Sequence, residues 1–412
     1  MPATSAGMTR MRIALSIILT GFLLGAPARA ADPEFQQFLQ ALWPEAQAKG
    51  VSREVFDAAI KDLEPDLTLP DLIIPGRVEA QPPQAEFVQP PSAYLKEATF
   101  DRLTAKGRAL AVQHKATLDR IEKEFGVPGP IVLAIWGRET DYGSYKVGRD
   151  VVRVLATQAY LGNRKDMFRD ELIIAFKMLQ DGVPRAQMRS SWGGAMGFVQ
   201  LMPSEYYLYG TDFDGDGRID IFNSVPDSLA AAAKQLVVKG WHAGTPWAYE
   251  VRAPANADCS VGSPDHALPM AEWLKRGFVP VYGRKLSTAE LAEDVSLLQP
   301  EGSYGPAFLI TRNYHVLKGY NPSDLYVLFV GHLADRISDP RPFATPWSKT
   351  DQLRSTDVQA MQRVLSERGF YKDKIDGKAG MFTRAALGAY QKANGLKVDC
   401  WPTPALLGAM RN

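Results

Sequence analysis

Apolar residues recur every three or four positions along much of this chain, a spacing typical of amphipathic helices. Residues 94–179 show it over their whole length, whereas residues 64–93 hold many prolines and predict an extended arm along a surface. The first helical stretch covers residues 32–63, where the apolar positions include Phe35, Phe38, Leu39, Leu42 and Trp43. The N-terminal half therefore predicts a mainly helical protein.

The second half mixes element types. Residues 188–227 are rich in Gly, Asp and aromatic side chains and predict loops around a site. We expect a helix over Asp227–Trp241, with Asp227 or Ser228 as its N-cap, and helical structure over Asn313–Ile337. The stretch between these helices is mixed, and short strands are expected around Phe278 to Tyr282. A small amount of sheet should therefore accompany the helices.

The prolines Pro340, Pro342 and Pro346 break the helical pattern near the C-terminus. We place a domain boundary there. The predicted organisation is one domain over residues 31–340, a Pro-rich linker over 341–350 and a compact module over 351–412.

The N-terminal 30 residues predict a signal peptide. Arg10 and Arg12 precede an apolar stretch, and Ala28-Arg29-Ala30 has the small-x-small pattern of a cleavage site. The alternative is an uncleaved membrane anchor, but Ile13 to Leu24 is short for a membrane span. We expect an exported, periplasmic protein without a stable membrane anchor. The 47 basic and 46 acidic residues nearly balance, so nothing indicates a nucleic-acid partner.

Glu139 is the most informative candidate for chemistry. It lies late in the run PGPIVLAIWGRETDYGSY, which predicts a buried helix with Pro128 and Pro130 in its first turn and Gly143 as a stop signal. Burial and the negative end of the helix dipole both raise the pKa of such a carboxyl group, so that it could donate a proton near neutral pH. The alternative is a Glu that pairs with Arg138 or faces water.

The run SSWGGAMGFVQLMPSEYYLYG, residues 190–210, suits a carbohydrate ligand. Ser191 and Gln200 offer neutral hydrogen-bonding groups, and Met196, Phe198 and Met202 offer apolar walls. The glycines allow the backbone to approach a ligand. The alternative is a tight turn between helices with its aromatic residues in the core.

These two runs, with NRKDMFRDEL, DFDGDGRIDIFN and TRNYHVLKGYNPSDLYVLFVGHLADRI, resemble the lytic murein transglycosylase B family in sequence and in order, over roughly residues 35–340. The resemblance implies a mainly α, α+β lysozyme-like catalytic domain. It also implies cleavage of the bond between N-acetylmuramic acid and N-acetylglucosamine in peptidoglycan glycan strands.

The resemblance assigns roles by position. Glu139 matches the catalytic acid, and Ser191 and Gln200 match residues that contact glycan. Gln235 stands where some relatives carry Tyr, so one stacking contact is expected to be missing. The remaining matches are the cleft residues Tyr320, Asn321 and Tyr326, the arm aromatic Tyr94, and the basic pair Arg164 and Lys165 expected to meet the peptide stem.

A single carboxyl group suffices for this reaction, whereas ordinary glycosidases use two. Glu139 would protonate the glycosidic oxygen, and its carboxylate would then take the proton of the sugar's 6-hydroxyl as that oxygen closes on the anomeric carbon. The product is a 1,6-anhydro sugar. Asp141 should point away from Glu139 and serve the helix end. The alternatives are a hydrolytic muramidase on the same fold and a non-catalytic wall-binding scaffold.

DFDGDGRIDIFN follows the EF-hand template and predicts a structural Ca²⁺ site. Asn223 replaces the expected bidentate Glu at position twelve, so Asp227 could close a lengthened loop over 212–227. The alternative is a solvated acidic turn. The predicted ligands are Asp212, Asp214, Asp216, the carbonyl of Arg218, Asp220, Asn223 and Asp227.

Residues 351–412 resemble the peptidoglycan-binding module of bacterial wall hydrolases, a small three-helix bundle. Val358, Met361 and Leu365 give one apolar helical face, and Asp376-Gly377 supplies a turn. The module should tether the enzyme to the polymer. Cys259 and Cys400 could pair in an oxidising compartment, but the sequence leaves this open.

Overall fold

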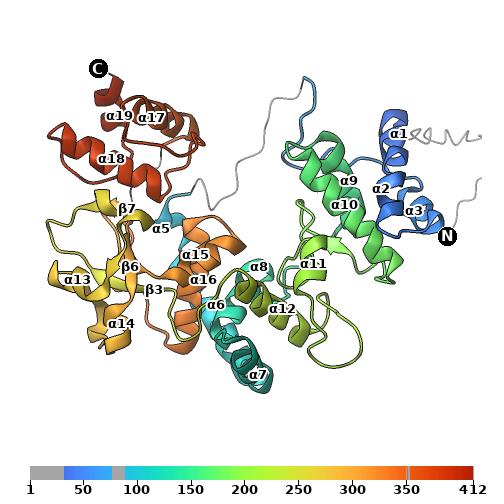
Figure 1. Ribbon diagram of the computed structural model, residues 1–412, viewed down its shortest axis with the longest axis horizontal. Coiled ribbons are helices and arrows are strands. Elements are labelled where there is room, and N and C mark those ends of the chain that lie inside the picture. Colours follow the sequence, from blue (N-terminus) through green and yellow to red (C-terminus); the bar gives the residue numbers. More distant parts are fainter. Residues whose placement is uncertain (1–31, 77–88, 349, 351–352, 412) are drawn as a thin grey trace, which may run out of the picture.

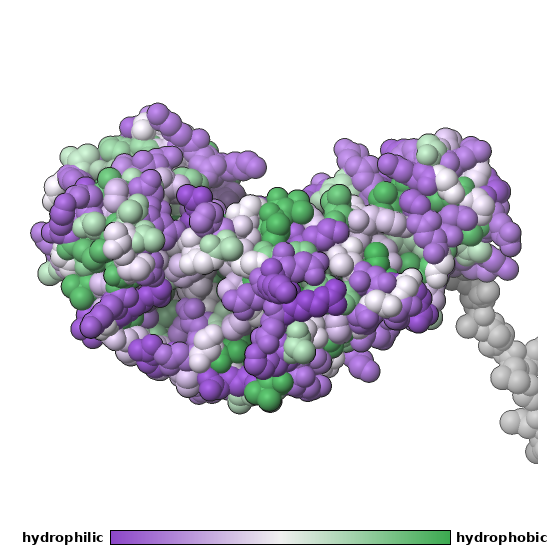
Figure 2. All heavy atoms as spheres, turned by 60° about the horizontal axis from the view of Figure 1, so that its bottom comes forward, coloured by the Kyte–Doolittle hydropathy of each residue, from purple (hydrophilic) through white to green (hydrophobic). Residues whose placement is uncertain are grey.

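The computed structural model describes residues 32–76, 89–348, 350 and 353–411. The predicted signal peptide lies outside these residues. The molecule is elongated, with the N-terminal helices at one end, the C-terminal module near the other and a helical centre between them (Figure 1). Hydrophilic residues cover most of the face in Figure 2, whose outline is hollowed between the two ends. Among the described residues, no helix is long and apolar enough to cross a bilayer.

The N-terminal lobe is a helical layer. Its helices pack mainly on the long helix α10, and the rings of Phe56 and Phe176 meet edge to face at 5.3 Å. A two-stranded ribbon of β1 and β2 borders the lobe. The elements are α1 (Pro33–Ala41), α2 (Trp43–Ala48), α3 (Arg53–Ile60), β1 (Arg149–Asp150), α9 (Val151–Leu161), α10 (Lys165–Gln180), β2 (Arg189–Ser190) and α11 (Pro203–Tyr209). α11 is a helix within residues 188–227, where the sequence predicted loops.

The central layer is built around α8, which carries Glu139. α8 contacts α6, α12 and α16, and a helix enclosed in this way is apolar on nearly every face. Residues 131–137 are all buried. The elements are α5 (Pro91–Tyr94), α6 (Glu97–Gln113), α7 (Lys115–Phe125), α8 (Gly129–Thr140), α12 (Val225–Val238), α15 (Arg312–Tyr320) and α16 (Asp324–Ser338).

Two helix boundaries differ from the predicted ones. α12 starts at Val225 because the Ser224 hydroxyl accepts a hydrogen bond from the Asp227 N–H at 3.3 Å, so Ser224 and not Asp227 is the N-cap. The predicted helix over Asn313–Ile337 is divided into α15 and α16. Pro322 follows Asn321, and a proline restricts the residue before it to extended conformations.

An antiparallel sheet in the order β4-β6-β8-β3-β5 forms the next layer. Tyr249, Trp273 and Leu309 belong to the apolar cluster on one of its faces. The elements are β3 (Ala248–Arg252), η1 (Cys259–Val261), η2 (Pro264–His266), β4 (Leu268–Pro269), α13 (Met270–Lys275), β5 (Val279–Pro280), η3 (Val281–Gly283), α14 (Thr288–Ala292), β6 (Asp294–Leu298), β7 (Pro300–Ser303) and β8 (Ala307–Ile310). The strand predicted around Phe278 is thus one of a larger set.

The C-terminal module is a three-helix bundle of α17 (Ser355–Glu367), α18 (Met381–Ala393) and α19 (Pro404–Arg411). Met361, Leu365 and Leu387 belong to its own core. Gly377 adopts φ +73° in the predicted turn, and its N–H donates to the buried Gln362 Oε1 at 2.8 Å. The structure as a whole is mainly α, with an α+β domain and a small helical module, as the sequence predicted.

The described part of the Pro-rich segment, residues 341–348 and 350, lies against the sheet layer. Phe343 is buried beside Phe308 at 5.8 Å between ring centroids, and Ser348 donates to the fully buried Glu301. The module beyond it is attached at several points. Cys259 and Cys400 form a disulfide with a Cα–Cα distance of 6.1 Å, which decides the pairing that the sequence left open. Phe343 and Ser348 thus hold the Pro-rich segment along the domain that it leaves, and the disulfide joins the module to the same domain.

Candidate active site

Glu139 lies in the last turn of α8 and is half-buried. The hydroxyl of Tyr326, on α16, donates to Glu139 Oε1 at 2.5 Å. Burial raises the pKa of Tyr326 well above its ordinary value, and the Glu139 carboxylate acts in the same direction. Tyr326 therefore stays protonated and orients the carboxyl group of Glu139.

Arg138, the residue before the acid, contacts the aromatic side chains of Tyr94 and Phe329. Its Nε and Nη2 donate to the Tyr94 hydroxyl at 2.9 and 2.5 Å, and its guanidinium lies 5.4 Å from the ring centroid of Phe329. Burial opposes the charge of Arg138, but Tyr94 and Glu139 together raise its pKa. Tyr94, from α5, thus lies beside the helix end that carries Glu139, and its contact with glycan stays a prediction.

Asp141 serves the helix end. As the C-cap of α8 it adopts a left-handed conformation with φ 52°, and both of its carboxylate oxygens accept from Arg102, at 2.9 and 2.7 Å. Lys106 Nζ donates to its carbonyl at 2.8 Å. This agrees with the expectation that Asp141 caps the helix. The helix itself ends before Gly143, the stop that the sequence suggested.

Tyr320 connects the acid to the glycine-rich loop. Its ring stacks on that of Tyr326 with centroids 6.2 Å apart, and its hydroxyl donates to the Val199 carbonyl. Gln200 follows Val199 with φ 57°, and its side chain donates to the Gly197 carbonyl at 3.0 Å. Asn321 ends α15, and its side-chain oxygen accepts from the Ser323 N–H. These contacts place Tyr320 between Tyr326, which holds the acid, and the carbonyl of the residue before Gln200, while Asn321 follows Tyr320 in the chain.

The glycine-rich run folds into a tight loop in which some side chains are buried and others are partly exposed. Met196 exchanges backbone hydrogen bonds with Leu201 at 2.8 and 2.9 Å and is fully buried, so the prediction that it forms a wall of the site is wrong. Phe198 is half-buried against Trp136, with centroids 5.5 Å apart, and lines a cavity of about 440 Å³. Ser191 is half-buried at the start of the loop, where its N–H donates to the Ala195 carbonyl.

Three further predictions are modified by the packing. Tyr326 is 1% exposed, so it contacts the acid from within the core and offers no open ring to a ligand. Arg164 and Lys165 are exposed at the start of α10, where Arg164 lies 3.9 Å from Asp71. No described contact brings this basic pair to the cluster around Glu139. Arg164 and Lys165 lie on the N-terminal lobe, where the packing of α10 against α9 sets their position.

Glu205 is a site residue that the sequence did not reveal. It lies in the first turn of α11, and its oxygens accept from the Met202 N–H and from Gln235 Nε2, both at 3.0 Å. Burial raises the pKa of Glu205. Its charge acts on the Tyr320 hydroxyl together with that of Glu139. The signal for it was an acid three residues after Met202 at a helix start, which alone predicts only a cap.

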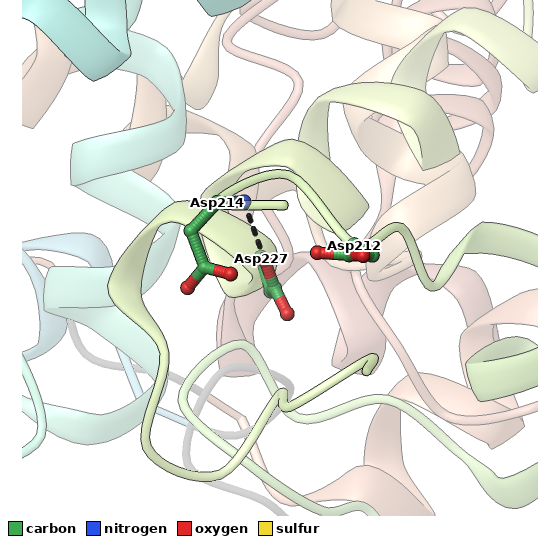
Figure 3. Close-up of side chains that lie close together, drawn as sticks. All are labelled: Asp212, Asp214 and Asp227. Atoms are coloured by element: carbon green, nitrogen blue, oxygen red, sulfur yellow. Dashed lines mark hydrogen bonds between the residues drawn. The ribbon is translucent and has the colours of Figure 1, made fainter. Parts of the chain in front are cut away.

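Three of the predicted metal ligands in the acidic loop lie close together. Carboxylate oxygens of Asp212, Asp214 and Asp227 lie within 4.8 Å of one another, and Figure 3 shows the three side chains converging. Asp227 is 1% exposed and accepts N–H groups from Phe213 and Asp220. Burial raises the pKa of Asp227, and the charge of Asp214 adds to this. A bound cation would relieve both effects.

The other predicted ligands are engaged elsewhere. Asp216 accepts from the Arg218 N–H at 2.9 Å, and the Asn223 side chain donates to Asp220 at 2.9 Å. Within the described residues, the carboxylates of Asp216 and Asp220 are not part of the cluster of three. Their role as ligands, like that of Asn223 and of the Arg218 carbonyl, stays a prediction. The loop ends beside the glycine-rich loop, since the Phe198 N–H donates to the Ile221 carbonyl at 3.0 Å.

Comparison with known proteins decides the family. The transglycosylase SLT domain model matches residues 34–335. The chain belongs to the transglycosylase SLT family. The peptidoglycan binding domain model matches residues 354–410. Both matches confirm the resemblance drawn from the motifs, and the protein is a lytic transglycosylase by family and by fold.

Individual relatives agree with this assignment. Membrane-bound lytic murein transglycosylase B of Escherichia coli (strain K12) is 27% identical over 274 residues, which cover 61% of this chain and 70% of the relative. SltB3 from Pseudomonas aeruginosa, solved in complex with NAG-NAM-pentapeptide, is 38% identical with a TM-score of 0.81, covering 92% of this chain and 99% of SltB3. The Escherichia coli lytic transglycosylase Slt35 in complex with calcium shares the fold, with 22% identity, a TM-score of 0.57 and coverage of 75% and 94%.

Proposed function

We propose that this transglycosylase is exported to the periplasm and cleaves the β-1,4 bond between N-acetylmuramic acid and N-acetylglucosamine in peptidoglycan, with Glu139 as acid and then base. The observation that carries the proposal is the contact between Glu139 and the buried Tyr326 hydroxyl, at the end of an apolar helix. The relative SltB3 is described in complex with a peptidoglycan fragment, which supports the substrate class.

The reaction needs no second carboxylate. Glu139 transfers its proton to the glycosidic oxygen as the bond to the anomeric carbon breaks. The sugar's 6-hydroxyl oxygen then bonds to that carbon and gives its proton to the Glu139 carboxylate, which restores the acid. Asp141, the nearest acid in sequence, is held by Arg102, and Glu205 accepts hydrogen bonds from Met202 and Gln235. Tyr94, Ser191, Gln200, Tyr320, Asn321 and Phe198 would contact the glycan.

The mass of the product tests this proposal. Purified peptidoglycan incubated with the protein should release muropeptides that are one water lighter than hydrolytic products, because the 6-hydroxyl replaces water as the nucleophile. Mass spectrometry of the soluble fraction measures the difference, with a hydrolytic muramidase as the reference. Products of the hydrolytic mass would contradict the proposal and identify a muramidase. Complete absence of release by the wild type would indicate a non-catalytic scaffold.

We also propose that Asp212, Asp214 and Asp227 hold a structural Ca²⁺. Hard oxygen ligands in a short loop suit this ion, and a related structure of the same fold is described in complex with calcium. The backbone bond from Phe198 to Ile221 links the loop to the glycine-rich run. Calcium would therefore stabilise the loop that carries Gln200, without a step in the reaction.

Calcium at a hundredfold excess over its Kd should stabilise the folded protein by about 2.7 kcal/mol and raise its Tm. Scanning calorimetry with calcium and with chelator measures the shift. Asp227→Asn should abolish the calcium-dependent part, because it removes the buried charge of the cluster. Asp216→Asn is the matched control, since Asp216 lies outside the cluster, and should keep the shift. An unchanged wild-type Tm would disprove the site.

A further inference from the structure

The C-terminal module docks on the start of α16, the helix that carries Tyr326. Arg384, on α18 of the module, donates from its Nη2 to Oδ2 of Asp324, the first residue of α16, at 2.9 Å. Both side chains are less than one-tenth exposed. Met381, in the first turn of α18, belongs to the same buried apolar cluster as Tyr326. The two domains therefore share a contact at this helix end from which water is largely excluded.

Asp324 links Arg384 to two helices of the catalytic domain. Its Oδ1 accepts from Lys318 Nζ at 2.8 Å and from the Tyr314 hydroxyl at 2.7 Å, and both of these donors lie on α15. Oδ2 is left for Arg384. A buried carboxylate that is held by charged donors on both oxygens has little freedom to move, because a displaced charge would lose its partners without gaining water. The Asp324 carboxylate thus fixes α15, α16 and α18 to one another.

The path from Asp324 to the acid is short. Tyr326 lies two residues further on in the same first turn, where its N–H donates to the hydroxyl of the N-cap Ser323 at 3.5 Å. Its own hydroxyl donates to Glu139 Oε1 at 2.5 Å, and its ring stacks on Tyr320, the last residue of α15. A shift of the start of α16 would therefore move the hydroxyl that orients the acid.

Other contacts fasten the module to the sheet layer. The disulfide between Cys259 and Cys400 joins η1 to the chain after α18, and Lys392 pairs with Asp258, the N-cap of η1, at 2.7 Å. These contacts reach the sheet layer and not α15 or α16. The contact made by Arg384 can therefore be removed while a covalent bond still keeps the module on the catalytic domain.

We propose that Arg384 is a positioning residue for the reaction: through Asp324 it holds the start of α16 so that the Tyr326 hydroxyl stays on Glu139. The inference rests on the proposed function, in which Glu139 is acid and then base, and deepens it. Arg384 acts through these two side chains and not by contact with the glycan. The module then contributes to turnover as well as to tethering, because one of its own side chains supports the geometry of the acid.

Steady-state kinetics of Arg384→Met on purified glycan strands tests the proposal. Met keeps much of the length of the side chain but not its charge, and the disulfide still holds the module in place. We expect kcat to fall by about tenfold or more, because a small displacement of a catalytic group has an effect of this size. KM should be unchanged, since Arg384 acts on the acid and not on the bound strand. Arg384→Lys restores a cation beside Asp324 and should recover most of kcat.

Lys392→Met is the matched control, since it removes the other cation of α18 that pairs with the catalytic domain. Its kcat should equal that of the wild type. Circular dichroism verifies that each variant is folded. If Arg384→Met does not fold, Arg384→Gln replaces it, because the amide can still donate to Asp324 without the charge. Its kcat should also fall, again with KM unchanged.

The kinetic pattern separates this inference from the proposed function. The inference is overturned if the folded Arg384 variant without a charge keeps the kcat of the wild type, or if its KM rises while kcat is unchanged. It is also overturned if Arg384→Lys recovers nothing, or if Lys392→Met loses as much kcat. If the wild type releases no anhydro product from the strands, the proposed function fails instead, whatever the variants show.

Discussion

Glu139→Gln is expected to reduce the release of soluble products from peptidoglycan by a factor of about 10³ or more. The amide cannot give a proton to the glycosidic oxygen or take one from the 6-hydroxyl. It keeps the size of the side chain, and its oxygen still accepts from the Tyr326 hydroxyl. The fold and the binding of glycan should therefore survive. Turnover is measured on purified sacculi, and binding is measured by co-sedimentation with them.

Asp141→Asn is the control for this variant. Asp141 lies two residues away and caps α8 with φ 52°, a conformation that Asn tolerates. Its loss of charge weakens the exposed contact with Arg102 and should leave turnover within a few-fold of the wild type. Near-normal turnover in Glu139→Gln would remove Glu139 from the mechanism. If Asp141→Asn lost as much turnover as Glu139→Gln, the loss would come from disturbance of the helix end and not from the missing acid.

Asp324→Asn is expected to destabilise the protein by about 3–5 kcal/mol. The Asp324 side chain is 9% exposed and lies between Lys318 at 2.8 Å and Arg384 at 2.9 Å. Tyr314, which is fully buried, also donates to it at 2.7 Å. The amide would leave the almost buried Arg384 without a countercharge. Denaturant unfolding at neutral pH measures the loss.

The same contacts give a pH dependence with a defined sign. Burial opposes the charge of Asp324, but Lys318 and Arg384 outweigh it and lower its pKa below the ordinary value of 3.8. Its folded pKa is lower than its unfolded pKa, so its contribution is complete above about pH 4 and is lost as the pH falls toward the folded value. Asp324→Asn should lack this part of the acid sensitivity.

Asp119→Asn is the matched control for Asp324→Asn. Asp119 pairs with Lys115 at 2.6 Å on α7, but its side chain is 61% exposed. An exposed pair of this kind contributes about 0–1 kcal/mol. Equal losses of stability in the two variants would contradict the buried role of Asp324. The same conclusion would follow if the wild type and Asp324→Asn lost stability equally steeply as the pH falls.

The pattern of neighbouring residues predicted the helices and loops that carry the site. It predicted the side-chain contacts within the site less well. The apolar run of α8 and the glycine-rich and acidic loops were identified correctly, because helical periodicity and turn chemistry are properties of adjacent residues. The wall assigned to Met196 was wrong because the hairpin with Leu201 turns that side chain inward. Nothing in the sequence of the loop fixes which of its apolar residues faces the solvent.

The acidic loop over residues 212–227 shows the same limit. Asp212 and Asp214 of the template lie beside Asp227, the residue that the substitution at Asn223 suggested for closing the loop. Asp216 and Asp220 fit the template by residue type and spacing, but among the described residues their carboxylate oxygens lie outside the cluster of three. Which of these acids converge depends on the backbone course around the buried Asp227, which a linear template does not contain.

The sequence by itself determined a mainly helical domain with an acid at the end of an apolar helix, an acidic loop and a small helical module. Each of these follows from residues close together in the chain. Only the tertiary structure decided that Tyr326 meets Glu139 across 187 residues and that Cys400 meets Cys259 across 141. Such pairs form because packing brings distant helices together, and the free energy of that packing is shared among many side chains.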